Sequence, residues 1–464
     1  MARSVYVATS DPNSGKTVVA LGAMEAASRR AERVAFFRPV VRESPEADPS
    51  LRLMRARYRL PFPAESLYGA NRETVRRLLA EDRTDDLIKL VLEKYKAVEE
   101  QADLVVCEGT SFAGLAPAYE FNLNADLAAN LGAAVVQVVT ARGKSDADVL
   151  DAVRIALDQL ADRGCDVLAA AVNHAPPDRL DALRSRLRGE VGGTPVYVLP
   201  ADPVLDRPTV GEIAEALGAA RLAGSDPGLE TEVRGYLVAA MTLPNFLDRL
   251  REGYLIVTPG DRADILVGSL ASVAAHTLPN VAGLVLTGGL TPPPQVMRLV
   301  GGLSPVPILG VTADTFETAT AVAGVPAALR PENERKIASA LGLFEAHVDL
   351  AELESRIAAT KPTRVTPLMF EYELIRQAKA DRRHVVLPEG AEPRVLRAAD
   401  ILLRRGVVDL TLLGDEGQVR RAAASLGVNL DGVPVIDPAA SPWLDDFVKT
   451  YVELRKAKAV NEAV

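Results

Sequence analysis

The chain has 464 residues, of which 48% are hydrophobic and 25% charged, and its formal net charge is −9. These proportions are typical of a globular protein of about three domains, and the negative charge argues against a nucleic-acid partner. No run of about 18 apolar residues occurs, so we expect no membrane span. The N-terminus lacks a long apolar stretch, and Cys107 and Cys165 lie in apolar strand-like segments. These features indicate free thiols and a cytoplasmic protein.

Residues 1–215 alternate short apolar runs with helical patterns. The runs are bounded by Gly, Pro or Asp and predict strands at residues 4–10, 33–40, 103–109, 133–141, 167–175 and 194–200. Because helical patterns lie between them, we expect an α/β domain with a parallel, doubly wound sheet. Ligands of this architecture bind at the carboxyl ends of the strands.

A candidate phosphate-binding loop, SDPNSGKT, occupies residues 10–17 between the first predicted strand and a helix. Backbone N–H groups at a helix N-terminus attract anions, so we expect phosphate binding by the loop residues Ser14, Gly15, Lys16 and Thr17. Lys16 would place a positive charge on the terminal phosphates, and Thr17 would offer a hydroxyl to Mg²⁺. Because Ser10 stands where such loops usually have their first glycine, a turn without nucleotide is the alternative.

Four more polar side chains follow or end predicted strands: Asp11, Arg38, Glu108 and Asn173. Glu108 is a candidate ligand of Mg²⁺, directly or through water, and Asp11 is a second candidate. Arg38 could face a carboxylate or phosphate, and Asn173 could read a base edge. A structural role at a strand end remains open for each of them. Together they would surround one edge of the sheet.

These segments resemble the dethiobiotin synthetase family, whose loop reads G-T-D-x-x-x-G-K-T. Here Thr9, Ser10 and Asp11 precede the intact Gly15, Lys16 and Thr17, and the similarity continues through FRPV, CEG and VNHA over most of residues 1–215. The resemblance implies a P-loop NTPase-like fold with ATP and Mg²⁺ as candidate ligands. Arg38 stands where that family carries a lysine.

The second predicted unit, residues 216–328, has strand-like runs within 253–270, 281–289 and 306–314, with loops rich in Gly, Pro, Asp and Thr. Its turns DRADIL and LTGG are adequately explained as structural turns. They also resemble the signature of the DRTGG domain, which implies a regulatory or scaffolding unit. We therefore assign no catalysis to Asp261, Arg262 or Gly288. Residues 329–365 predict a helical connector.

The last predicted unit, residues 366–464, begins an α/β domain. Strands are predicted at 384–390, 409–414 and 433–438, and helices at 392–406 and 415–427. Three strands and two helices are too few to bury a sheet with helices on both faces. We therefore expect a partial domain, with much of its machinery beyond Val464.

Two cations of this unit are candidate ligand-binding residues. Arg394 lies in a first helical turn, where a cation is mildly unfavourable, so a ligand or an ion pair is expected there. Arg455 lies near Lys456 and Lys458 and would suit a phosphate-bearing cofactor. Solvated side chains at a helix end are the alternative.

The stretches LPEGAEPR, RRGVVDLTLLGDEGQV, VIDP and YVELRK resemble the phosphate acetyltransferase and butyryltransferase family. The order of the three units resembles the long bacterial form of that family. The resemblance implies the conversion of acetyl-CoA and phosphate to acetyl phosphate and CoA, with Arg394 and Arg455 as CoA-binding candidates. The family's catalytic residues belong to a later part of its domain, so no residue here is assigned as catalytic.

Two other functions remain open: a non-catalytic nucleotide-sensing protein, and an ATP-dependent ligase similar to dethiobiotin synthetase. The expected partners are small molecules, namely acetyl-CoA, acetyl phosphate and phosphate. We expect no nucleic-acid or membrane partner, and we expect a homo-oligomer.

Overall fold

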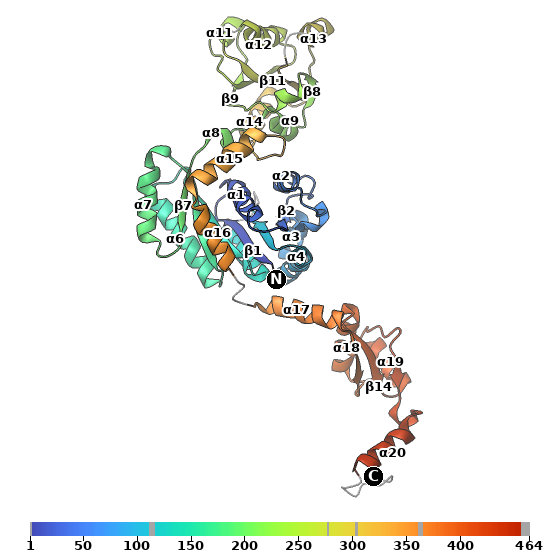
Figure 1. Ribbon diagram of the computed structural model, residues 1–464. Helices are drawn as coiled ribbons and strands as arrows, with labels where there is room; N and C mark the ends of the chain where they lie inside the picture. The colour runs from blue at the N-terminus through green and yellow to red at the C-terminus, as the bar shows by residue number, and fades with distance from the viewer. Residues whose placement is uncertain (1, 111–116, 276–277, 302–304, 361–364, 456–464) are drawn as a thin grey trace. The chain divides into compact units, whose positions relative to one another are not determined.

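The computed structural model describes residues 2–110, 117–275, 278–301, 305–360 and 365–455 (Figure 1). The chain forms two compact units, Met1–Val365 and Thr366–Val464. None of the helices among the described residues is long and apolar enough to cross a membrane.

The first unit contains a seven-stranded parallel sheet of order β3-β2-β4-β1-β5-β6-β7. Its strands are β1 (Arg3–Thr9), β2 (Val34–Val41), β3 (Tyr68–Asn71), β4 (Leu104–Glu108), β5 (Ala134–Thr140), β6 (Val167–Ala175) and β7 (Val196–Pro200). Every residue of β2, β4 and β5 is buried, so both faces of the sheet are covered. The predicted parallel, doubly wound α/β fold is confirmed. The prediction omitted β3, a four-residue strand.

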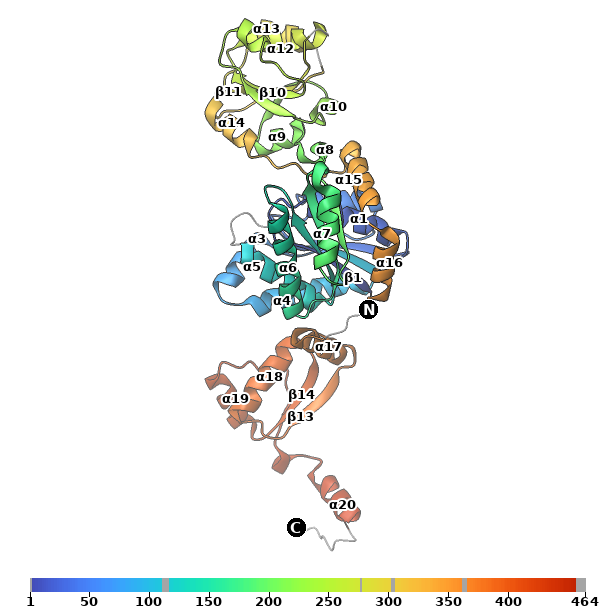
Figure 2. The same cartoon turned by 90° about the vertical axis from the view of Figure 1, so that its left-hand side faces the viewer.

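Helices lie on both sides of this sheet (Figures 1 and 2). Those between the strands are α1 (Lys16–Ser28), α2 (Pro49–Tyr58), α3 (Arg72–Ala80), α4 (Thr84–Glu99), α5 (Pro117–Leu131), α6 (Asp146–Asp162) and α7 (Leu180–Glu190). Two later helices, α15 (Glu334–His347) and α16 (Leu350–Ala359), pack against α1. The contact with α15 is close, since a Cβ at Gly22 would lie 2.3 Å from the ring of Phe344. Both helices fall in the segment predicted to be a connector.

A second sheet of the first unit has five strands in the order β8-β12-β11-β10-β9. These strands are β8 (Ala220–Ala223), β9 (Gly235–Val238), β10 (Tyr254–Pro259), β11 (Val281–Thr287) and β12 (Ile308–Gly310). All pairs are parallel except the one between β8 and β12. Short helices, among them α9 (Val210–Ala216), α12 (Ala263–Ala275) and α14 (Thr315–Ala323), complete this region.

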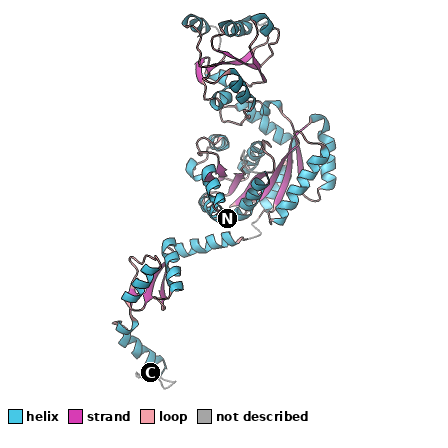
Figure 3. Cartoon of the chain, turned by 180° about the vertical axis from the view of Figure 1, so that it is seen from behind, coloured by secondary structure: helices cyan, strands magenta, loops and turns pink. Residues whose placement is uncertain are grey.

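The second unit contains a three-stranded parallel sheet, β13 (Arg383–Leu387), β14 (Val408–Leu413) and β15 (Val435–Ile436) (Figure 3). A small core forms between this sheet and the helices α18 (Pro393–Arg405) and α19 (Glu416–Ser425). The side chain of Glu392 caps α18, and Gly406 ends it at φ 61°, a value that favours glycine. Two more helices, α17 (Pro367–Ala380) and α20 (Leu444–Arg455), flank this core in the sequence.

Candidate functional site

The loop between β1 and α1 has the local geometry of a phosphate-binding loop. Gly15 precedes the helix at φ 72°, in the left-handed region that favours glycine. A Cβ at this position would lie 2.2 Å from Nδ2 of Asn173, so only glycine fits. Nδ2 of Asn173 donates to the carbonyl oxygen of Ser14 at 2.9 Å. Asn173 therefore supports the loop, and its recognition of a base edge stays a prediction.

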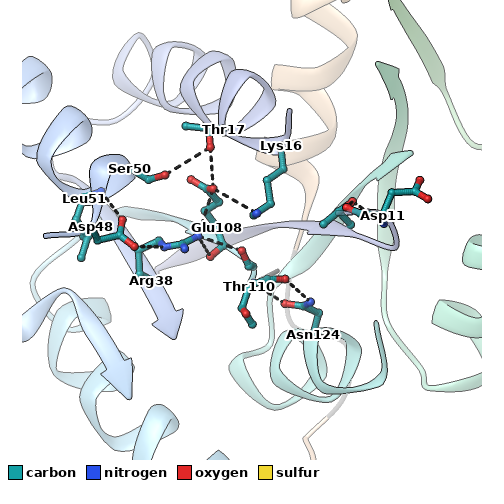
Figure 4. A network of polar contacts seen from close by, with 12 residues as sticks. Asp11, Lys16, Thr17, Arg38, Asp48, Ser50, Leu51, Glu108, Thr110 and Asn124 are labelled. Carbon is teal, nitrogen blue, oxygen red and sulfur yellow. Dashed lines mark hydrogen bonds and ion pairs between the residues drawn. The ribbon is translucent and has the colours of Figure 1, made fainter. Parts of the chain in front are cut away.

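Lys16 and Thr17, the first residues of α1, both face Glu108 at the end of β4 (Figure 4). Oγ1 of Thr17 donates to Oε1 of Glu108 at 3.0 Å, and Nζ of Lys16 lies 4.0 Å from the same oxygen. Burial lowers the pKa of Lys16, and the carboxylate of Glu108 counters this in part. The structure thus brings together three of the side chains that the sequence singled out.

Arg38 joins this group from β2. Its Nη1 lies 3.2 Å from Oε1 of Glu108 and donates to the carbonyl oxygens of Glu108 and Gly109, each at 3.0 Å. Its Nε lies 3.3 Å from Oδ2 of Asp48. Burial opposes the charge of Arg38, but the carboxylates of Asp48 and Glu108 outweigh it and raise the pKa of Arg38 above its usual value. Arg38 is therefore a buried cation bound to two carboxylates.

Sequence reasoning missed two members of this group, Asp48 and Ser50. Asp48 caps α2 by accepting a hydrogen bond from the backbone N–H of Leu51 at 2.9 Å, and its other carboxylate oxygen faces Arg38. Oγ of Ser50 lies 3.4 Å from Oγ1 of Thr17. An Asp before a Pro is a helix-start signal that could have identified the cap. Nothing in the sequence indicated the ion pair.

Four buried polar atoms at this site have no hydrogen-bond partner among the described residues: Oγ of Ser14, Nε of Arg38, Oε2 of Glu108 and Oγ1 of Thr110. An unsatisfied buried polar group costs about 1–3 kcal/mol, so such groups are rare in folded proteins. A ligand or bound water that met these atoms would recover that free energy.

Asp11 lies apart from this group (Figure 4). One of its carboxylate oxygens accepts from the backbone N–H of Thr140 at 3.0 Å, and the other lies 2.7 Å from Nζ of Lys144. Thr140 also contacts His174, whose Nδ1 is 2.9 Å from the threonine Oγ1. Asp11, which follows β1, therefore makes these contacts with residues at and just after the end of β5.

The predicted Mg²⁺ ligands Thr17, Asp11 and Glu108 do not converge on one point. Asp11 is paired with Lys144, and Oε1 of Glu108 is shared by Thr17 and Arg38. Across the described ranges, no group of three His, Cys, Asp or Glu side chains is placed to hold a metal ion. Mg²⁺ demands near-ideal octahedral oxygen ligation, which this set does not supply as it stands.

The DRTGG-like turns lie at the ends of β10 and β11. Arg262 pairs with Asp264 at 2.8 Å and donates to the carbonyl oxygen of Met241 at 2.8 Å. Gly288 and Gly289 have φ values of 80° and 65°, a turn geometry that favours glycine. These contacts are those of a structural turn.

Arg394 and Arg455 make separate local contacts in the second unit. Nε of Arg394 lies 2.9 Å from Oε1 of Glu392, and 86% of the Arg394 side chain is exposed. The guanidinium of Arg455 lies 5.8 Å from the ring centroid of Tyr451. Arg455 is the last described residue, and Lys456 and Lys458 lie outside the described residues. No contact joins the two arginines within the described part of the chain.

Three protein families match successive parts of the chain. The AAA domain family matches residues 3–209, the DRTGG domain family residues 212–325, and the family described as Phosphate acetyl/butaryl transferase residues 369–464.

Curated relatives match nearly the whole chain. A phosphate acetyltransferase of Nitratidesulfovibrio vulgaris is 40% identical over 99% of this chain and 67% of its own length. A phosphate acetyltransferase of Synechocystis sp. is 32% identical over 100% of this chain and 68% of its own length. A third, from Deinococcus radiodurans, is 30% identical over 99% of this chain and 66% of its own length.

Among solved structures, an ATP complex of a Cyanothece McdA variant matches 44% of this chain and 85% of its own at 10% identity. Its TM-score of 0.31 is too low to support an inference.

Proposed function

The chain belongs to the phosphate acetyltransferase family, and we propose that it joins the acetyl-transfer reaction of that family to a phosphate-binding site in its first domain. The reaction exchanges an acetyl group between coenzyme A and phosphate, so its substrates are small molecules: acetyl-CoA, acetyl phosphate and phosphate. Family membership sets aside a dethiobiotin-synthetase-like ligase as the function of the whole chain. A nucleotide-sensing role remains compatible with membership for the first domain alone.

Arg394 and Arg455 are our proposed contacts for coenzyme A. Arg394 is exposed, and Arg455 ends α20, a helix with no buried side chain, so both cations are accessible to a ligand. Arginine binds phosphate through paired N–H donors, and coenzyme A carries several phosphate groups.

Arg455→Ala is expected to weaken coenzyme A binding by about tenfold, since a charge-assisted hydrogen bond contributes about 1.5–3 kcal/mol. Arg394→Ala is expected to act in the same direction. Titration calorimetry with coenzyme A measures both. Arg420→Ala is the control, because Arg420 is likewise an exposed arginine paired with a glutamate, Glu416, at 2.8 Å. Equal affinities in all three variants would reject both proposed contacts.

The proposed ligand of the first domain is a phosphate-bearing nucleotide bound at Ser14–Thr17. The observation that supports this proposal is the group of Lys16, Thr17 and the buried Glu108 at a helix N-terminus, with Oγ of Ser14 and Oε2 of Glu108 unsatisfied among the described residues. Backbone N–H groups at this helix start and the charge of Lys16 both favour an anion. ATP is the predicted nucleotide. The Mg²⁺ predicted with it is not part of this proposal, because its three predicted ligands do not converge.

Lys16→Ala is expected to weaken ADP and ATP binding by about 10–100-fold, from the loss of one or two charge-assisted hydrogen bonds to phosphate. Calorimetric titration of the purified chain measures the affinity. Lys96→Ala is a matched control, since Lys96 is a lysine of similar burial paired with Glu99 at 2.6 Å. Negligible binding by wild type, or equal binding by wild type and Lys16→Ala, would reject the proposed site.

A further inference from the structure

The guanidinium of Arg38 lies between two buried carboxylates at the mouth of the phosphate loop (Figure 4). Its Nε faces Asp48 at 3.3 Å and its Nη1 faces Glu108 at 3.2 Å. The exposed fractions of Arg38, Asp48 and Glu108 are 9%, 7% and 1%. Both acids therefore depend on a neighbouring cation for their charge balance, because isolated buried charges are strongly disfavoured.

Two carboxylates beside a threonine hydroxyl are also the oxygen groups that bind Mg²⁺ next to a nucleotide phosphate. Here Thr17 donates to Glu108 at 3.0 Å, and Ser50 lies 3.4 Å from Thr17. Without Arg38, the first domain would present Asp48, Glu108 and two hydroxyl groups to a metal ion. Because Arg38 is present, the carboxylates of Asp48 and Glu108 each already form an ion pair with its guanidinium.

Arg38 also has N–H donors that make no hydrogen bond within the described part of the chain. In the part of the chain that the structure describes, the hydrogen bonds of Arg38 all come from Nη1. Nε lies 3.3 Å from Asp48 as an ion pair but has no hydrogen-bond partner there, and Nη2 makes no hydrogen bond. A guanidinium is planar, and its donors have a fixed geometry. The contacts of Nε and Nη1 therefore also fix the direction of the Nη2 N–H groups.

We propose that Arg38 takes the place of a divalent cation at this site, so that a nucleotide phosphate binds to Lys16, the loop and Nη2 of Arg38 without a metal ion. This inference rests on the nucleotide site proposed above. A metal ion would be a third cation beside Arg38 and Lys16, and both would repel it. The negative charges of Glu108 and Asp48 would not attract it strongly, because Arg38 already balances them.

Oε2 of Glu108 is the one feature that favours a metal instead, since it is buried and has no described partner. In the metal-free site, this oxygen accepts a hydrogen bond from water or from a ligand hydroxyl. The two arrangements predict opposite responses to chelation and to substitution of Arg38.

The first test is titration of ADP into the full chain in excess EDTA and in excess Mg²⁺. Wild type is expected to bind ADP with affinities that differ by less than about threefold between the two conditions. Arg38→Lys is expected to bind at least about tenfold more weakly in EDTA and to regain affinity with Mg²⁺, because one ammonium cannot pair with both carboxylates. Arg33→Lys is the control, an exposed arginine just before β2 that pairs with Asp103 at 2.7 Å. A wild-type affinity that falls tenfold or more in EDTA would overturn the inference.

The second test needs no nucleotide: Mn²⁺ alone is titrated and followed by electron paramagnetic resonance. Wild type is expected to lack a Mn²⁺ site that depends on Glu108, whereas Arg38→Lys gains a site that the additional change Glu108→Gln removes. A wild-type Mn²⁺ site that Glu108→Gln abolishes would contradict the inference, as would a failure of Arg38→Lys to gain one. Circular dichroism confirms that each variant is folded. Absence of ADP binding together with the expected Mn²⁺ results would reject the nucleotide site alone.

Discussion

Arg38→Gln is expected to lower the free energy of unfolding of the chain by about 3–5 kcal/mol, the range found when one partner of a buried ion pair is removed. The change would leave Asp48 and Glu108, both buried, without the guanidinium that contacts them at 3.3 and 3.2 Å. Lys16 is too far from Glu108, at 4.0 Å, to replace both contacts. Urea unfolding followed by circular dichroism measures the loss.

Two further variants test the assignment of this loss to the buried pair. Arg33→Gln removes an exposed arginine from the pair with Asp103, and a much smaller loss is expected because such pairs are solvated. Arg38→Gln combined with Asp48→Asn is expected to lose less than the sum of the two single variants, because the residues are coupled. Equal losses for Arg38→Gln and Arg33→Gln would show that the buried pair adds no stability.

Lys336→Met is expected to cost about 3 kcal/mol of unfolding free energy, near the lower end of the range for broken buried pairs. The Lys336 side chain is 0% exposed, and its Nζ lies 3.3 Å from Oε2 of Glu212. Arg330 remains 3.6 Å from Oε1 of Glu212, which limits the loss. Methionine has a similar length, so the change removes the charge and leaves little cavity. Chemical denaturation measures the difference.

Arg335→Met is the matched control, because the neighbouring Arg335 is 70% exposed and pairs with Glu232 at 3.4 Å. Its expected cost is about 1 kcal/mol, the upper end for exposed ion pairs, because the Arg335 guanidinium is solvated whereas Glu232 is 8% exposed. Lys336→Met with Glu212→Gln is expected to recover part of the loss, since no unpaired carboxylate remains. A double variant as unstable as the sum of its parts would show that the two side chains do not interact.

Lys336 also helps to connect two parts of the first unit. It lies in α15, which packs against α1 directly after the phosphate loop, and its partner Glu212 lies in α9. About two turns further along α15, Phe344 packs closely against Gly22 of α1. A single helix thus contacts both the element that starts at Lys16 and the first element of the segment matched by the DRTGG domain family.

Local patterns were sufficient to predict the elements of the phosphate site. The apolar run before residues 10–17 predicted β1, and the GKT motif at a helix start predicted the loop. The sequence motifs alone also led to the phosphate acetyltransferase family, to which the curated relatives assign the chain. These features depend on residues that are close in sequence.

Local sequence patterns did not predict which side chains contact each other in the fold. Asn173 was a candidate for reading a base edge or for a structural role, and only the fold shows that it donates to the loop at Ser14, 159 residues away. Asp11 was a candidate metal ligand with a structural role left open, and only the fold shows its contact with Lys144, 133 residues away. Asp48 carried a cap signal but no sign of its ion pair with Arg38. The sequence determined which residues end a strand or start a helix.

The tertiary structure decided which of those ends meet. The sheet order β2-β4-β1-β5-β6 puts Arg38 beside Glu108, Glu108 beside the loop after β1, and the loop beside Thr140 and Asn173. Backbone periodicity and capping act over a few residues, so a single sequence records them. Strand order is set by the burial of whole faces and by crossover connections, and these involve residues far apart in the chain. For this reason the GKT loop was visible in the sequence, while the cation between Asp48 and Glu108 was visible only in the fold.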